Sequence, residues 1–405
     1  MPETAGFQIG DLKSSQDPYA ILEAARAKSG AVFDAGGSWF IFGHAEGTKI
    51  LRNASTRSGF IADGFRRRLP AGAAQDEMAH RINFLDPPDH TRVRRLVGKA
   101  FTPRLTASLR PFVETIVRDL LAKFPEDEPV DFVHDFAHEV PSLVISELLG
   151  VPVSDRDRLT QLSDQVSRLL GTDNTEDEMS NAIVGAEEMH ETLRVLLAER
   201  RAQPKDDLLS ALLAAEDERE KLSETELLSL AATLYSAGHR TTRDLFSNGL
   251  TALLPRPDFI AAIQGGELPI AAVVEEFLRY ETPTHMIGRM LTEPLEVGGH
   301  KIEPGQYIGV LLAAANRDPE AYDRPNDFDP WRWTRKPEPP APLSFALGAH
   351  FCVGASLARL EVGVMLEILL QIFPKIRLHD DALTWHHTGV FRGVDSLPVI
   401  LGPRS

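Results

Sequence analysis

The chain has 405 residues and a formal net charge of −16, with 43% hydrophobic and 25% charged residues. This composition is ordinary for a globular protein with a substantial core. The negative charge argues against broad nucleic-acid binding and against adsorption on anionic membranes. The single cysteine excludes an internal disulfide and a structural zinc site built from several cysteines.

Helical patterns dominate the predicted elements in chain order. Residues 3–16 contain no apolar run that fits a signal peptide or a membrane anchor, and no later segment approaches eighteen apolar residues, so we expect a cytoplasmic protein without a membrane partner. Apolar residues recur at three- and four-residue spacing, which predicts helices, at 105–124, 136–149, 176–201 and 271–280. Short strand-like stretches lie at 38–43, 295–302, 307–311 and 397–401.

These elements indicate a mainly α-helical fold with small β-sheets. No internal repeat, low-complexity tract or flexible linker divides the sequence, so we expect one domain over residues 1–405. Residues 327–342 are rich in proline and charge, which predicts an ordered, irregular meander.

The most informative predicted helix runs from about 223 to 254. Ser223 and Glu226 fit a capping box at its start, and Pro255 ends it. About thirty residues give a length of roughly 45 Å, which is enough to cross a domain. Gly238 and the two threonines at 241–242 weaken the helix near its middle. This weak point is either a locally tolerated defect or an opening of the hydrogen-bond ladder beside a ligand.

Cys352 lies in a loop, 345–354, directly before a predicted helix that begins at Ala355. A lone cysteine is most often a small buried hydrophobic residue. Here, however, the backbone N–H groups and the positive end of the helix dipole favour a thiolate. Gly348 and Gly354 let the backbone bend and approach a flat ligand closely. In the same loop Phe345 offers a ring to such a ligand, and His350 offers a hydrogen bond to an acidic group on its rim.

This loop resembles the haem-binding loop of the cytochrome P450 family, Phe-x-x-Gly-x-His-x-Cys-x-Gly. Every defined position of that pattern is matched, by Phe345, Gly348, His350, Cys352 and Gly354. The resemblance implies the cytochrome P450 fold and haem b (iron protoporphyrin IX) as the cofactor. It also implies that the Cys352 thiolate is the axial ligand of the iron and pushes electron density toward O–O cleavage.

A second similarity concerns a structural network. Glu276 and Arg279 resemble the Glu-x-x-Arg pair of the family, and Arg332 corresponds to a third member in the meander. Glutamate and arginine three residues apart lie on one helix face, and alone such a pair is an ordinary surface ion pair. The resemblance implies instead a buried network that locks the cysteine loop.

A third similarity concerns the haem propionates. His90 and Arg94, within the stretch 86–94, match residues with which the family binds these carboxylates, and Arg289 matches another such arginine. The resemblance therefore implies that His90, Arg94, Arg289 and His350 hold the propionates, and charge-assisted hydrogen bonds suit that role.

The sequence departs from the family at one functional position. The stretch Ala237-Gly238-His239-Arg240-Thr241-Thr242 stands where the family has Ala/Gly-Gly-x-acid-Thr, on the helix that passes the distal face of the haem. Thr241 is retained, which implies a role in oxygen activation. Arg240 replaces the acid that, together with the threonine, organises proton delivery in the family, and an arginine does not release a proton at working pH.

Three interpretations of Arg240 stay open. In the first, Arg240 pairs with Asp244 or another carboxylate and points away from the haem. In the second, it binds a carboxylate or another anion of the substrate. In the third, the enzyme relies on substrate groups or on peroxide in place of a protein acid.

The resemblance implies a monooxygenase of secondary metabolism that hydroxylates or epoxidises an organic substrate with O2. The chain carries no flavin or nicotinamide motif, so the electrons are expected from a separate acidic ferredoxin with its reductase. Residues 90–113 contain no acidic residue, and the resemblance implies that this basic region lies on the cysteine side of the haem, where an acidic ferredoxin docks. The basic residues of this stretch are Arg92, Arg94, Arg95, Lys99, Arg104 and Arg110.

The segments that contact substrate in the family are mainly apolar here, with Arg66, Arg67, Arg68 and His285 among them. They indicate a mainly apolar substrate and are compatible with a polar or acidic group on it. Two other functions remain. One is an oxidation that uses peroxide or is atypical, such as coupling, desaturation or decarboxylation, and Arg240 is the only residue that supports it. A non-catalytic haem-binding sensor needs neither Thr241 nor the basic stretch.

Overall fold

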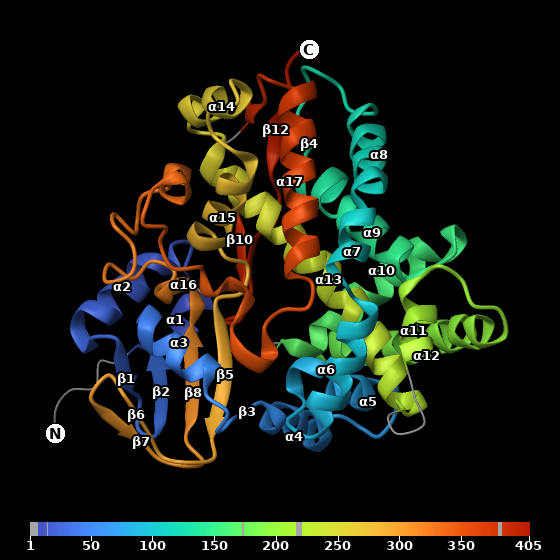
Figure 1. The fold of residues 1–405 in the computed structure, drawn as a ribbon, viewed down its shortest axis with the longest axis vertical. Helices are drawn as coiled ribbons and strands as arrows, with labels where there is room; N and C mark the ends of the chain where they lie inside the picture. Colours follow the sequence, from blue (N-terminus) through green and yellow to red (C-terminus); the bar gives the residue numbers. More distant parts are fainter. Residues whose placement is uncertain (1–6, 14, 172–173, 216–220, 380–382) are drawn as a thin grey trace. The chain divides into compact units, whose positions relative to one another are not determined.

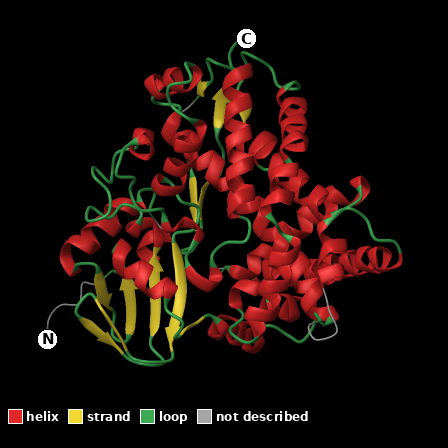
Figure 2. Cartoon of the chain, in the orientation of Figure 1, coloured by secondary structure: helices red, strands yellow, loops and turns green. Residues whose placement is uncertain are grey.

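The computed structural model describes residues 7–13, 15–171, 174–215, 221–379 and 383–405, and helices make up most of this part of the chain (Figure 2). The chain forms two compact units. Unit 1 consists of Met1–Arg57, Glu114–His138 and Thr241–Ser405, and unit 2 consists of Ser58–Val113 and Glu139–Arg240. The predicted mainly α-helical fold with small sheets is confirmed, and the assignment of one domain to residues 1–405 stays a prediction.

Unit 1 contains a five-stranded sheet (Figure 1). Its strands follow the order β1 (Val32–Asp34), β2 (Ser38–Ile41), β8 (Tyr307–Leu311), β5 (Met286–Leu291) and β3 (Thr56–Arg57). Strands β2 and β8 run parallel, and the other neighbours run antiparallel. Ile41, Ile308 and Val310 of this sheet pack into one core with Ile50 of helix α3 (His44–Arg52).

Smaller sheets and further helices complete unit 1. The two-stranded pairs are β6 (Leu295–Val297) with β7 (His300–Ile302), and β10 (Trp385–His387) with β11 (Arg392–Val394). A three-stranded sheet has the order β4 (Val130–Asp131), β12 (Pro398–Ile400), β9 (Arg377–Leu378). The other helices of unit 1 are α1 (Ile9–Lys13), α2 (Pro18–Ser29), α14 (Pro257–Gln264), α15 (Ile270–Tyr280), α16 (Leu312–Ala315) and α17 (Ala355–Ile372).

Unit 2 is helical throughout its described regular elements. Its helices are α4 (Gly59–Arg68), α5 (Ala73–His80), α6 (Asp89–Ala100), α7 (Pro103–Ser108), α9 (Glu139–Leu149), α10 (Val153–Ser167), α11 (Glu176–Ala202) and α12 (Leu208–Ala215). Two helices contain a boundary between the units, namely α8 (Arg110–Leu121) and α13 (Glu224–Leu253).

Within the described ranges, no single helix is long and apolar enough to cross a membrane. One bent pair of helices, Val133–Leu149 with Val153–Leu170, meets the requirement of length and composition only when its two parts are taken together.

Two of the predicted helices are confirmed almost residue for residue, as α11 and α15. The helix predicted at 105–124 is wrong as one element, because it is divided at Leu109 into α7 and α8. Pro111 lies in the first turn of α8, where a proline lacking its N–H is tolerated, whereas it would interrupt a helix interior. The helix predicted at 136–149 begins only at Glu139, after a π-helical turn over Val133–Ala137.

The single strand predicted at 295–302 is also wrong, because the structure has a hairpin of β6 and β7 there. Gly298 and Gly299 adopt positive φ angles of 55° and 79°, which a two-residue hairpin turn requires. The other predicted strands are present as β2, β8 and β12.

The long predicted helix is present as α13. The N–H of Ser223 donates to Glu226 Oε2 (2.8 Å) and the N–H of Glu226 donates to Ser223 Oγ (3.2 Å), so the capping box forms. The α-helix continues through Gly238 without a break in helical conformation. A Cβ at Gly238 would lie 3.1 Å from Ile145 Cδ1 of α9. The glycine therefore serves close packing of α13 on α9, which is the tolerated-defect interpretation.

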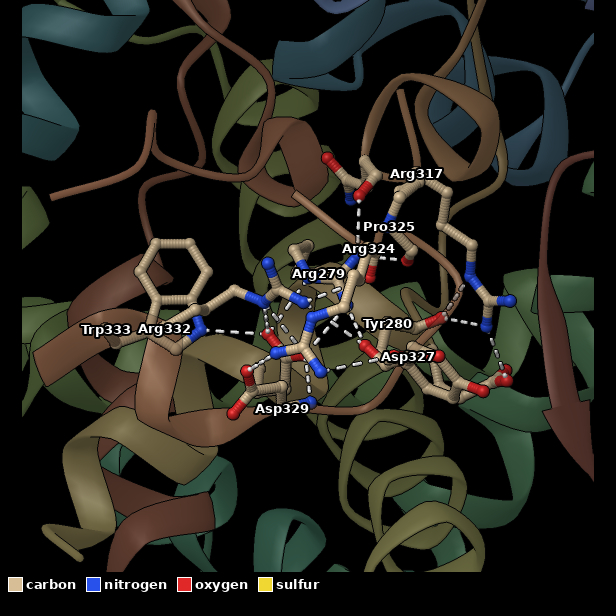
Figure 3. A network of polar contacts seen from close by, with 12 residues as sticks. Arg279, Tyr280, Arg317, Arg324, Pro325, Asp327, Asp329, Arg332 and Trp333 are labelled. Carbon is tan, nitrogen blue, oxygen red and sulfur yellow. Dashed lines mark hydrogen bonds and ion pairs between the residues drawn. The ribbon is translucent and has the colours of Figure 1, made fainter. Parts of the chain in front are cut away.

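The buried carboxylate of Glu276 on α15 joins two arginines, Arg279 and Arg332, which are labelled in Figure 3. Arg279 donates to both of its oxygens, from Nη2 to Oε1 (2.7 Å) and from Nε to Oε2 (2.9 Å). Arg332 Nε lies 3.2 Å from Oε1 and 3.1 Å from Oε2. The backbone N–H of Asp329 and the indole N–H of Trp333 donate to the same carboxylate. Each carboxylate oxygen thus has several donors, as a buried charge requires.

The two arginines also hold the meander. Arg279 donates to the carbonyls of Asn316, Pro325 and Asp327. Arg332 donates to the carbonyls of Asp323, Arg324 and Asp327. These carbonyls belong to a segment without strand partners, so the guanidinium groups satisfy backbone acceptors that regular structure would otherwise satisfy (Figure 3).

Asn316 extends this network to the loop that precedes Cys352. Its Oδ1 accepts the N–H of Leu343 (2.7 Å), and its Nδ2 donates to Ser344 Oγ (2.9 Å). Ser344 Oγ in turn donates to the carbonyl of Leu278 on α15 (2.5 Å). Residues 343–345 are therefore fixed to α15 through side-chain hydrogen bonds.

Replacing Glu276 with glutamine would remove the buried negative charge and leave Arg279 and Arg332 as unpaired buried cations. We expect this change to lower the free energy of unfolding by about 3–5 kcal/mol, measured from the urea midpoint in far-UV circular dichroism. The matched control is Glu275→Gln on the same helix. Glu275 pairs with the partly exposed Arg359, so its replacement should cost about 1 kcal/mol or less. Equal midpoints for Glu276→Gln and the unsubstituted protein would contradict a structural role of the network.

Candidate functional site

Cys352 is exposed and stands at the end of a loop closed by its own backbone, because its N–H donates to the carbonyl of Phe345 (3.0 Å). Gly354, two residues on, is the N-cap of α17, and a Cβ placed on it would lie 4.0 Å from Cys352 Sγ. The sulfur is therefore close to the first turn of a helix of eighteen residues, whose dipole favours the thiolate. This exposed position rules out the alternative of a buried hydrophobic cysteine.

The backbone of the loop leaves no room for side chains at one point. Gly348 has a φ of +72°, and a Cβ there would lie 2.5 Å from the carbonyl oxygen of Leu51 at the end of α3. Ala346 also has a positive φ, of 56°, which costs energy for a residue other than glycine. The loop is thus held in a strained conformation against α3, and such strain persists only where the surroundings determine the backbone.

Aromatic and cationic side chains support the same loop. The guanidinium of Arg359 on α17 lies over the ring of Phe345, 4.7 Å from its centroid, and is held there by Glu275 of α15. The rings of Phe345 and Phe351 are in edge-to-face contact at 6.4 Å. Phe345 is therefore positioned from α15 through two side chains, which fits its predicted role as a packing surface for a flat ligand.

Unit 1 also contains two of the four residues predicted to bind the haem propionates, Arg289 and His350. Arg289 lies on β5, is buried, and donates from Nη1 to the carbonyl of Gly288 (2.8 Å). His350 ends the short 3₁₀ turn that precedes Cys352 and is half-buried. Both side chains belong to elements that the core of unit 1 fixes in place.

Unit 2 contains the remaining candidates, His90 and Arg94, at the start of α6. The carboxylate of Asp86 accepts the N–H groups of Ser58 (2.7 Å) and Gly59 (3.0 Å), which anchors the turn before the helix. His90 is buried and Arg94 is half-buried. Because they are four residues apart on one helix, their side chains lie on the same face. The structure thus places His90 and Arg94 side by side on α6. Their binding of haem propionates stays a prediction.

One residue of the predicted docking face, Arg92 on α6, has partners within its own unit. Arg92 pairs with Asp89 (3.1 Å) and with Glu226, and it donates to the carbonyl of Lys221 (2.9 Å). It therefore fastens α6 to the start of α13 within unit 2 and is not available to a docking partner. Arg95 and Lys99 of the same helix are exposed.

The middle of α13 is partly exposed to solvent at residues 237–242, which contain the predicted catalytic residues and are called the catalytic stretch below. Ala237 is exposed, and Gly238, Arg240 and Thr241 are half-buried, whereas residues 227–236 and 244–250 are buried. A helix that is buried before and after such a stretch offers its backbone and side chains to a ligand only there. Asp244, the carboxylate considered above as a partner of Arg240, pairs with Arg243 (2.8 Å) and lies 3.7 Å from His386 Nε2.

The sequence did not indicate two groups of residues that the structure brings into view. Asn316 has no local pattern that distinguishes it, although it connects the network of Glu276 to the cysteine loop. A buried polar cluster in unit 2, formed by Glu77, Arg81, His190 and Ser236, is not predicted from the sequence either, because His190 and Ser236 lie far along the chain from Glu77 and Arg81. A charged residue on the buried face of a helical pattern, such as Glu77 on α5, is the only sequence signal it offers.

Comparisons with known proteins identify the family of the chain. The family described as Cytochrome P450 matches residues 11–265 and 267–382. Cytochrome P450 107B1 of Saccharopolyspora erythraea is 39% identical over 342 residues, which cover 84% of this chain and 80% of the relative. The vitamin D(3) 25-hydroxylase of Pseudonocardia autotrophica is 36% identical over 419 residues, with 99% of both chains covered.

A solved structure is similar over nearly the whole chain. It is that of P450BioI in complex with an acyl carrier protein carrying hexadec-9Z-enoic acid, with a TM-score of 0.85, 31% identity, and coverage of 96% of this chain and 99% of the other. Family match, relatives and fold are consistent with the exposed Cys352 before α17. The chain therefore belongs to the cytochrome P450 family of haem-thiolate enzymes, and it is an oxidoreductase of the monooxygenase type.

Proposed function

We propose that the protein is a haem b monooxygenase that inserts one oxygen atom of O2 into a mainly apolar organic substrate, by hydroxylation or epoxidation. The observation that carries this proposal is the exposed Cys352 in a closed loop at the N-terminus of α17. Haem, when bound, supplies the reductive cleavage of O2, in which substrate, O2, two electrons and two protons give oxygenated product and water. The residues of the chain bind the haem, position the substrate and supply the protons.

The donor set of the chain fits iron protoporphyrin IX. Cys352 offers one thiolate, and the helix dipole of α17 stabilises its charge. Arg289, His350, His90 and Arg94 offer donors for two propionate carboxylates. We propose that Cys352 would bind the haem iron and that these four residues would hold the propionates.

The proton supply is assigned to Thr241, whose hydroxyl both donates and accepts a hydrogen bond. Arg240 donates only, so it orders acceptors such as water or a substrate carboxylate but does not release a proton. The acid that the family pairs with its threonine is therefore missing from its usual position on α13.

This replacement favours a second candidate function, an oxidation that uses peroxide. Hydrogen peroxide brings the oxygen atom together with two electrons and two protons, so substrate and peroxide give oxygenated product and water without a protein acid or a redox partner. Arg240 is the single observation in favour of this alternative.

For the O2-dependent reaction, we propose that an acidic ferredoxin delivers the electrons and is itself reduced by a separate reductase. The exposed Arg95 and Lys99 on α6 support this proposal, because an overall acidic chain presents positive charge there. Arg92 is excluded from the docking face by its pair with Glu226.

Replacing Cys352 with histidine tests the axial ligand. We expect the reduced protein with carbon monoxide to show the strongly red-shifted Soret band of thiolate haem, and we expect Cys352→His to lose that shift while haem remains bound. Haem content is measured separately, as the pyridine complex, so that loss of the shift is not confused with loss of haem. A Cys352→His protein that keeps the red-shifted band would refute the assignment.

Replacing Arg240 with glutamate restores an acid beside Thr241. General acid catalysis contributes at least about a hundredfold in rate, so we expect a clear rise in the fraction of electrons that reach product and a fall in peroxide-driven turnover. Both are measured with the compound that gives the largest haem spectral shift in a screen. Arg240→Gln is the control, because it removes the positive charge without adding an acid. Identical coupling, peroxide use and substrate affinity in all three proteins would exclude both a substrate-binding and a proton-supply role of Arg240.

Reversing the charge of Arg95 or Lys99 tests the docking face. We expect Arg95→Glu and Lys99→Glu to slow reduction by an acidic ferredoxin about tenfold at low ionic strength, and we expect the difference to shrink as salt is added, since salt screens the attraction. Stopped-flow absorbance measures the rate. Lys205→Glu makes the same charge change at an exposed position outside α6 and should leave the rate unchanged. A rate that does not depend on salt would rule out this face.

A further inference from the structure

Unit 2 contains a buried polar cluster that neither haem binding nor proton supply uses. Glu77 lies on α5 and Arg81 directly follows this helix, while His190 lies on α11 and Ser236 on α13. The four residues are exposed by only 0%, 3%, 4% and 5%, respectively. Helix α5 packs against α11 (Figure 1), so the cluster lies among three helices of one unit.

The cluster is centred on one ion pair. Arg81 Nη2 donates to Glu77 Oε1 (2.5 Å) and to Ser236 Oγ (3.2 Å). On the other side of the carboxylate, Glu77 Oε2 and His190 Nε2 are 3.8 Å apart, which is longer than a hydrogen bond. The pair is thus hydrogen-bonded to α13 on one side, whereas its carboxylate oxygen on the side of α11 makes no hydrogen bond with the described residues.

Three buried polar atoms of this cluster are unsatisfied. In the part of the chain that the structure describes, no group forms a hydrogen bond with Glu77 Oε2, Arg81 Nε or His190 Nε2. An unsatisfied buried polar atom costs about 1–3 kcal/mol. The network of Glu276 in unit 1 shows the contrast, because both oxygens of that carboxylate accept several hydrogen bonds. The pair of Glu77 and Arg81 thus has fewer partners within the described part of the protein than the pair of Glu276 and Arg279.

The chemistry of the cluster selects the ligand. Glu77 and Arg81 neutralise each other, and burial lowers the pKa of His190, so the histidine is neutral near pH 7. An anionic ligand would meet the open oxygen of Glu77, and a cationic ligand would meet Arg81. A hydroxyl group suits both. It donates to Glu77 Oε2, and it accepts from Arg81 Nε or from His190 Nε2 when the neutral imidazole carries its hydrogen on Nε2.

The distances also suit a single oxygen atom. One oxygen at about 2.8 Å from each of two atoms fits where those atoms are 3.8 Å apart, as Glu77 Oε2 and His190 Nε2 are. A ketone or an ether offers no donor for the carboxylate. Among the functional groups of an organic ligand, the hydroxyl is therefore a small neutral one that satisfies both sides of the cluster.

We propose that Glu77, Arg81 and His190 bind a hydroxyl group of the substrate, so that the substrate is a mainly apolar alcohol. This inference rests on the proposed function, since it assigns the cluster to the substrate of that reaction. Ser236 connects the cluster to the catalytic stretch, because it lies on α13 one turn before Arg240 and on the same helix face. The cluster thereby determines which part of the substrate lies beside that stretch.

The test compares three probes that differ only at one end: 1-dodecanol, its methyl ether and dodecanoate. Their binding to the haem-loaded protein is measured by isothermal titration calorimetry. We expect the alcohol to bind about tenfold more tightly than the ether, which lacks the donor, and than the carboxylate, which Glu77 repels. Neither comparison depends on the reaction itself.

Two variants locate the preference in the cluster. His190→Leu removes one side of the hydroxyl site, and Ser236→Ala releases the guanidinium of Arg81; both should reduce the preference for the alcohol over the ether to about twofold or less. Glu77→Gln is avoided as the main variant, because it leaves Arg81 as a buried unpaired cation. His80→Leu, a similar replacement at the end of α5, is the control and should keep the preference. Thermal unfolding checks that each variant is folded.

The outcomes separate this inference from the proposed function. It is overturned if the unsubstituted protein shows no preference for the alcohol, including the case in which 1-dodecanol does not bind, or if both variants keep the preference. A structural role alone would lower the unfolding temperature but would not change the ratio of the two affinities. The carbon monoxide spectrum tests the proposed function independently, because calorimetry detects alcohol binding whatever the haem ligand is.

Discussion

The conformation of the cysteine loop depends on the hydrogen bonds of one buried carboxylate, that of Glu276. Through Arg279 it reaches the carbonyl of Asn316, and through the side chain of Asn316 it reaches Leu343 at the start of that loop. The segment between these residues and Cys352 has no strand partner, so hydrogen bonds from side chains give it its shape. The proposed thiolate ligand Cys352 needs a fixed position, and side-chain hydrogen bonds rather than regular secondary structure hold the loop before it.

The structure also shows which parts of the molecule a sequence can specify. The capping box of α13, the glycines of the cysteine loop and the helix after Cys352 have causes within a few residues, so local patterns predicted them. The stretch 295–302 is a hairpin rather than one strand, because Gly298 and Gly299 reverse the chain between two strands of three residues each. The contacts of Asn316 with Leu343 and of Arg81 with Ser236 cannot be predicted from local patterns, because the two partners lie 27 and 155 residues apart.

Gly238 illustrates how packing decides between two interpretations of one residue. A glycine in a helix interior costs about 1 kcal/mol relative to alanine, and from the sequence this cost fits either a defect or a functional opening. The structure shows a continuous helix in which Gly238 faces Ile145 of α9 at a distance that a side chain would disturb. Close approach of the two helices offsets the cost. Because the helix stays regular, the directions of Arg240 and Thr241 follow from ordinary helical geometry.

Two buried glutamates in this molecule form the same kind of pair and have different roles. Glu276 is completely satisfied by its own chain, so it contributes stability and no recognition. Glu77 is satisfied on one oxygen only, so burying it has a cost that the folded protein alone does not recover. A site with such an unmet hydrogen bond rejects a purely apolar ligand and selects one that completes the pair. Incomplete pairing is thus a physical route to specificity. A ligand that completes the hydrogen bonds of the cluster recovers the free energy that burial of the unsatisfied atoms costs, and a ligand that does not complete them recovers none of it.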